Sequence, residues 1–89
     1  MASKFFKEAL SDRKPETQIF IKKYLDLVER IHQLLTEKDI SQKELAEALE
    51  LQPSAVSRML GKGGHNLTLK TISKLEAFFG QEILVVKGK

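Results

Sequence analysis

Residues 41–60 constrain the fold of this 89-residue chain more than any other segment. They hold two short runs in which apolar side chains recur at steps of three and four, with a break at residues 50–52. This spacing predicts two helices, each with one apolar face, joined by a tight turn. The apolar residues that we expect to face inward are Leu45, Ala46, Leu49, Leu51, Val56, Met59 and Leu60. The polar sides of both helices are then left exposed.

Local signals predict where these two helices begin and end. Ser41 and Glu44 form an S-x-x-E capping box, in which the two side chains satisfy two amide donors at the start of the first helix. Pro53 suits the first position of the second helix, where its missing N–H has no cost. That helix is expected to stop before Gly61. Two helices joined in this way form a helix-turn-helix, whose second helix can lie in the major groove of DNA.

Helical patterns also flank this segment. Residues 16–38 carry apolar side chains at helical spacing, which predicts a helix about 35 Å long. Thr68 is the expected N-cap of a last helix that ends at Gly80. Residues 83–86 are apolar and mostly β-branched, which predicts a short strand.

The chain is short enough to form one domain at most. We expect an arm at residues 1–15 with a helical turn or two, a DNA-binding domain at residues 16–80, and a C-terminal strand and tail at residues 81–89. The predicted fold is all-α, with about five helices and one short strand.

Composition excludes several classes of protein. The chain has no Cys and two distant His, so we expect no metal, no disulfide and no cofactor. Its apolar runs are only a few residues long, so we expect no membrane contact and a cytoplasmic location. Side chains do not converge in a catalytic pattern, so we predict that the protein is not an enzyme. A small domain without disulfides or metals is often stabilised by a partner subunit, and we therefore expect a homodimer.

The positive charge is concentrated around the second motif helix. The net charge is +3, but no Asp or Glu occurs within residues 51–75. The same window carries Arg58, Lys62, Lys70 and Lys74. A basic region around an exposed helix is typical of nucleic-acid binding.

Residues 41–80 resemble the Cro/phage-repressor, or Xre-like, family of helix-turn-helix domains. The matching segments are S-Q-K-E-L-A-E-A-L, A-V-S-R-M-L, N-L-T-L-K-T-I and L-E-A-F-F-G. The resemblance implies a lambda-repressor-like DNA-binding domain with an N-terminal helical extension. It also implies sequence-specific binding of double-stranded DNA by a transcriptional regulator, expected to be a repressor.

The same resemblance implies a set of DNA-binding residues. In this family, the Gln at the start of the first motif helix commonly bonds a phosphate or supports the second helix. Exposed residues of the second helix contact bases, and the loop that follows contacts the DNA backbone. Ordinary solvent-exposed side chains remain the alternative for each. The residues in these places are Gln42, Lys43, Gln52, Pro53, Ser54, Ser57, Arg58, Lys62, His65 and Asn66.

Two residues depart from the family pattern. Glu50 stands where the family usually carries Gly in a left-handed conformation, at an expected cost of about 1 kcal/mol. Pro53 stands where relatives often place a base-reading Gln, and it cannot donate a hydrogen bond. Base reading is therefore expected to shift to Gln52, Ser54 and Arg58.

The N-terminal extension and the segment H-N-L-T-L-K-T-I are also similar to HigA-type antitoxins, which bind their own operator as dimers and hold a toxin. The alternative function is therefore an antitoxin that neutralises a toxin protein and autoregulates its operon. Residues that could serve as a partner or dimer interface, or as local core, are Phe5, Phe6, Phe20, Tyr24, Ile83 and Val85.

Overall fold

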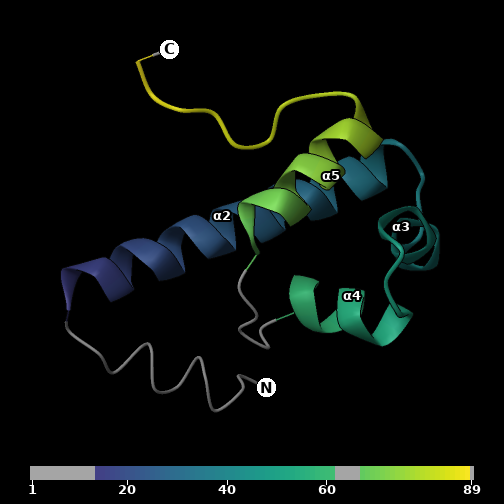
Figure 1. Ribbon diagram of the computed structural model, residues 1–89, viewed down its shortest axis with the longest axis horizontal. Coiled ribbons are helices and arrows are strands. Elements are labelled where there is room, and N and C mark those ends of the chain that lie inside the picture. The colour runs from purple at the N-terminus through teal and green to yellow at the C-terminus, as the bar shows by residue number, and fades with distance from the viewer. Residues whose placement is uncertain (1–13, 62–66, 89) are drawn as a thin grey trace.

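The computed structural model describes residues 14–61 and 67–88, and this part of the chain forms four α-helices (Figure 1). They are α2 (Pro15–Glu37), α3 (Gln42–Leu49), α4 (Pro53–Leu60) and α5 (Leu69–Phe79). The all-α class is confirmed. The fifth helix was expected in the arm at residues 1–15, of which residues 1–13 lie outside the described residues. None of the described helices is long and apolar enough to cross a membrane.

The long helix α2 takes part in two apolar clusters. It begins at Pro15 and ends within one residue of the predicted end. In its second half, Ile31, Leu34 and Leu35 belong to the main core. In its first half, Ile21 and Tyr24 form a smaller cluster, against which Phe20, Val28 and Leu67 pack. The first half of α2 is therefore held by a cluster separate from the main core.

All four helices contribute to the main core. α3 contacts both α4 and α5, and α2 contacts α4. The remaining buried residues of this core are Leu45, Ala46, Leu49, Val56, Met59, Leu60, Leu75 and Phe79. The inward orientation predicted for Leu51 is wrong, because its side chain is 41% exposed. Leu51 follows the left-handed Glu50, so the backbone has already left the helical path that would turn its side chain inward.

The predicted helix ends are present as hydrogen bonds. The Glu44 N–H donates to Ser41 Oγ at 3.1 Å, and the Ser41 N–H donates to Glu44 Oε1 at 3.1 Å. The Thr71 N–H donates to Thr68 Oγ1 at 3.1 Å, which makes Thr68 the N-cap of α5. Gly80 ends α5 with φ +72°. Each of these signals acts over only a few residues, and each is confirmed.

The strand predicted at residues 83–86 is wrong. The described part of the C-terminal segment contains no strand and turns back over α2 (Figure 1). The N–H groups of Ile83 and Leu84 donate to the Glu76 carboxylate, at 2.7 and 2.9 Å. These two hydrogen bonds hold the pKa of Glu76 below its usual range. Two donors that a β-ladder would need are therefore bonded to a side chain of α5, and no neighbouring strand is described to pair with them.

Candidate nucleic-acid interface

The turn between α3 and α4 has the geometry that the motif requires. Glu50 adopts φ +58° and ψ +40°, which is the left-handed conformation expected where relatives carry Gly. The Glu50 N–H donates to Glu47 O at 3.2 Å, and the Leu51 N–H donates to Ala46 O at 2.9 Å. These hydrogen bonds satisfy carbonyls of the last turn of α3, as in a Schellman-type ending. The chain can therefore reverse within three residues and start α4 at Pro53.

Helix α4 has one buried face and one exposed face. Val56, Met59 and Leu60 lie in the main core. Ser54 and Arg58 are four residues apart on the opposite side, and both are exposed, as is Ser57 beside them. The apolar contacts thus fix the helix on the domain while its polar face stays open to a ligand.

The first residues of α4 are also exposed. Gln52 is the N-cap in an extended conformation, and its carbonyl accepts hydrogen bonds from the N–H groups of Ala55 and Val56. Its side chain makes no capping hydrogen bond. Pro53 occupies the first helical position, as predicted. The Gln52 side-chain amide therefore remains available at the exposed start of α4.

Other residues of the predicted set lie on α3 or outside the described residues. Gln42 and Lys43 form the exposed first turn of α3, next to the capping Ser41. Lys62, His65 and Asn66 fall in residues 62–66, outside the part of the chain that the structure describes. The described geometry therefore concerns α3, the turn and α4.

Arg58 is a free cation with respect to its described neighbours. Its guanidinium makes no ion pair or hydrogen bond with the other residues that the structure describes, whereas Arg30 on α2 bonds Gln33, Gln81 and Glu37. A guanidinium in this state can bond phosphate oxygens or the O6 and N7 atoms of guanine. Arg58 is thus the side chain of α4 with the strongest potential for DNA contact.

Two side chains of α2 reach the end of α4, a role that their sequence pattern did not predict for either. Tyr24 Oη donates to Met59 O at 2.7 Å in the interior. His32 Nε2 lies 3.0 Å from Leu60 O. Tyr24 is only 3% exposed, so its ring packs within its own chain. Its spacing of seven residues from the buried Ile31 indicates that both side chains lie on the same, inward face of the helix.

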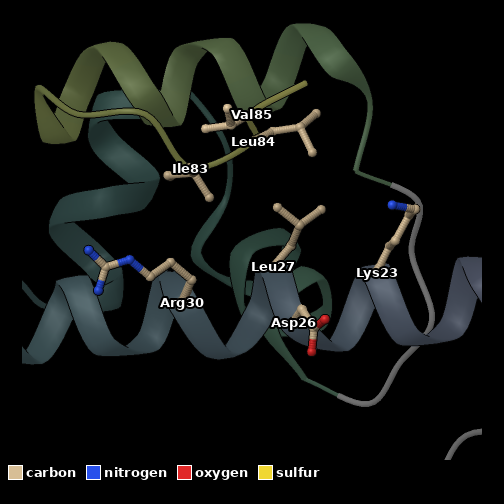
Figure 2. A pocket seen from close by; sticks show the side chains of 7 residues that line it. All are labelled: Lys23, Asp26, Leu27, Arg30, Ile83, Leu84 and Val85. Atoms are coloured by element: carbon tan, nitrogen blue, oxygen red, sulfur yellow. The ribbon is translucent and has the colours of Figure 1, made fainter. Parts of the chain in front are cut away.

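Of the remaining residues of the predicted partner surface, Phe20 belongs to α2, and Ile83 and Val85 belong to the C-terminal segment. Phe20 and Ile83 are half-buried, and Val85 is 62% exposed, while Phe5 and Phe6 lie outside the described residues. Figure 2 shows a groove between α2 and the C-terminal segment, in which Leu27 points toward that segment and Asp26 points away. The groove has a volume of about 330 Å³ and is lined by Lys23, Asp26, Leu27, Arg30, Ile83, Leu84 and Val85.

Comparison with known proteins identifies the family. No curated protein and no solved structure is similar enough to this chain to give a match. The family model described as Helix-turn-helix matches residues 31–85, more than half of the chain. The match runs from the second half of α2 through α3, α4 and α5 into the C-terminal segment. The chain therefore belongs to the Cro/C1-type helix-turn-helix family and is a DNA-binding transcription regulator.

Proposed function

We propose that this protein binds a specific duplex DNA sequence and represses transcription from it. The observation that carries the proposal is the exposed face of α4, where Ser54, Ser57 and Arg58 lie opposite a buried apolar face, with Arg58 unpaired among the residues that the structure describes. Such a helix can enter the major groove with its polar side toward the base edges. Bound across a promoter, the protein would exclude other proteins from the same DNA.

Contacts are divided between bases and phosphates. Ser54, Ser57 and Arg58 face the base edges, together with the Gln52 amide at the start of α4, while Pro53 contributes only van der Waals contact. Gln42 and Lys43 bond phosphates from the first turn of α3. The proposed backbone contacts in the loop after α4 are Lys62, His65 and Asn66. Phosphate contacts supply much of the affinity and make it dependent on salt.

Arg58→Ala tests the role of α4. The duplex is first selected from a random pool by the wild-type protein, and affinities are then measured by gel shift. If Arg58 reads a base, its loss weakens binding by about 1–3 kcal/mol and relaxes specificity at one position. Lys38→Ala removes the same charge from the exposed C-terminal end of α2, outside the basic window of residues 51–75, and is the matched control. Unchanged affinity of the Arg58→Ala variant for the selected duplex contradicts the assignment.

The proposed DNA-binding form is a homodimer. Two recognition helices would then enter successive major grooves, about 34 Å apart, on a palindromic site. Val85 and Ile19 are 62% and 55% exposed, and burial between two copies would remove both from water. Sedimentation at increasing concentration tests this form, and a monomer at all concentrations contradicts it.

The groove beside α2 favours a second candidate function, that of an antitoxin. Leu27, Leu84 and Val85 line the groove, which could accept an apolar side chain of a toxin (Figure 2). Co-expression with the product of the adjacent gene tests this function. A complex that is lost when Leu84 is changed to Asp, with DNA binding retained, supports an antitoxin. The absence of a complex contradicts it and leaves repression as the single function.

A further inference from the structure

Helix α4 ends differently from its two neighbours. α3 and α5 both end on a residue in the left-handed conformation, Glu50 and Gly80, whose N–H bonds a carbonyl of the last turn. Gly61 at the end of α4 is extended instead, with φ −92° and ψ −171°. An extended residue turns the chain away from the helix, so among the described residues Gly61 forms neither the αL nor the Schellman ending that satisfies the last carbonyls.

Two side chains of α2 form hydrogen bonds with the last carbonyls of α4 instead. Tyr24 Oη donates to Met59 O at 2.7 Å, and this hydrogen bond is buried. His32 Nε2 lies 3.0 Å from Leu60 O, and because a carbonyl can only accept, the ring donates its Nε2 hydrogen. Two consecutive carbonyls of the last turn of α4 are therefore bonded from residues 28 and 35 positions earlier in the chain.

We propose that Tyr24 and His32 are positioning residues for the recognition helix, and that their hydrogen bonds to Met59 and Leu60 set the affinity for specific DNA. Neither side chain is assigned a DNA contact. The proposal rests on the DNA-binding function proposed above. It adds two residues of α2 that orient α4 from the side opposite its exposed face.

The length of α4 explains why its last turn matters. The helix has eight residues, so its last turn makes up about half of it. Ser57 and Arg58 belong to that turn, directly before the bonded carbonyls of Met59 and Leu60. If the turn frays, only the fraction of molecules with an ordered turn presents Arg58 correctly, and the apparent affinity falls by that fraction. Non-specific binding depends on total charge and is insensitive to this order.

The test compares Tyr24→Phe with the wild type on two duplexes of equal length. One is the sequence that the wild type selects from a random pool, and the other is a shuffled version of it. Tyr24→Phe keeps the buried ring and removes only the donor. We expect it to bind the selected duplex about tenfold more weakly, or about 1.4 kcal/mol. Affinity for the shuffled duplex should stay within about twofold, because the charge is unchanged. Amide hydrogen exchange should accelerate in the last turn of α4 relative to α5.

His32 supplies an independent pair of variants at the surface. His32→Leu removes the donor and should also weaken binding to the selected duplex, whereas His32→Gln offers an amide N–H to Leu60 O and should restore it. Thr68→Ala is the stability control, because it removes a hydroxyl cap from α5 and leaves α4 unchanged. It should lower the melting temperature without changing the ratio of specific to non-specific affinity.

Each outcome decides the proposal. Wild-type affinity of a folded Tyr24→Phe variant for the selected duplex overturns it, and so does an equal loss on both duplexes. If Tyr24→Phe does not fold by circular dichroism, the His32 pair decides, and an unchanged affinity of His32→Leu overturns the proposal. A random pool that yields no enriched sequence refutes the proposed function itself, and the positioning role fails with it.

Discussion

Replacing Glu50 by Gly is expected to stabilise this protein, although it removes a side chain from the centre of the DNA-binding motif. Glu50 adopts φ +58° and ψ +40°, where the Cβ of a non-glycine residue crowds the backbone. Its side chain is exposed and makes no hydrogen bond or ion pair with the other described residues. The substitution therefore removes strain and loses no contact that the structure describes.

The magnitude follows from two opposing terms. A left-handed conformation costs a non-glycine residue about 1–2 kcal/mol. Glycine gives the unfolded chain extra freedom, which lowers stability by about 0.4–1 kcal/mol. The difference between the middle values of these two ranges predicts that Glu50→Gly raises the free energy of unfolding by about 0.5–1 kcal/mol. For a domain of this size, that corresponds to a rise in Tm of about 2–8 °C.

Urea unfolding at constant pH and salt measures the effect. The midpoint should rise while the m-value stays the same, because the surface exposed on unfolding does not change. Glu47→Gly is the matched control, since it makes the same replacement three residues earlier, inside α3 at an exposed position. It should destabilise the protein by about 0.5–1 kcal/mol, because glycine weakens a helix interior. The two variants are therefore expected to change the free energy of unfolding in opposite directions.

Glu50→Ala separates the backbone effect from the charge effect. It removes the same carboxylate but keeps a Cβ in the left-handed conformation, so it should leave the midpoint close to the wild-type value. A midpoint that is unchanged or lower for Glu50→Gly, at constant m-value, refutes the strain argument. Equal stabilisation by Ala and Gly would show that the charge, and not the conformation, limits stability.

Two further predictions follow from the helix ends. Ser41→Ala removes the hydroxyl that accepts from the Glu44 N–H, so it should lower the free energy of unfolding by about 1 kcal/mol. Urea or thermal denaturation measures this loss, and an unchanged free energy of unfolding would contradict the role of Ser41 as a cap. Glu76→Gln should loosen the C-terminal segment, because the charged carboxylate accepts from Ile83 and Leu84, and amide exchange at these two residues should accelerate. Because the pKa of Glu76 is lowered by folding, the stabilisation from its charged carboxylate is present above its unfolded-state pKa and is lost as the pH falls through its folded-state pKa. In acid, the exchange rates of the wild type at Ile83 and Leu84 should therefore approach those of the variant. Exchange rates at Ile83 and Leu84 that are the same in both proteins at neutral pH would contradict this coupling.

Much of the fold was predictable because its signals are local. The capping box at Ser41 and Glu44, Pro53 at the start of α4, and Gly80 at the end of α5 each act within a few residues. The helical spacing of Val56, Met59 and Leu60 likewise predicted which face of α4 is buried. The left-handed turn at Glu50 came from the family resemblance, and the structure confirms it.

The errors have a common physical origin in contacts that are distant in the chain. β-branched residues at positions 83–86 favour a strand only when a partner strand is present. Here the Glu76 carboxylate takes the N–H groups of Ile83 and Leu84. Leu51 was expected inside on its hydrophobicity alone, yet the turn that precedes it directs its side chain outward.

The helices, the turn and the exposed polar face of α4 can be predicted from the sequence, because propensity, capping and periodicity depend on near neighbours. The contacts that support that face depend instead on how distant parts of the chain pack together. Tyr24 and Met59 are 35 residues apart, and their hydrogen bond exists because α2 crosses the end of α4. A pattern of residues predicts which face a side chain occupies, but which carbonyl it reaches depends on how the helices pack.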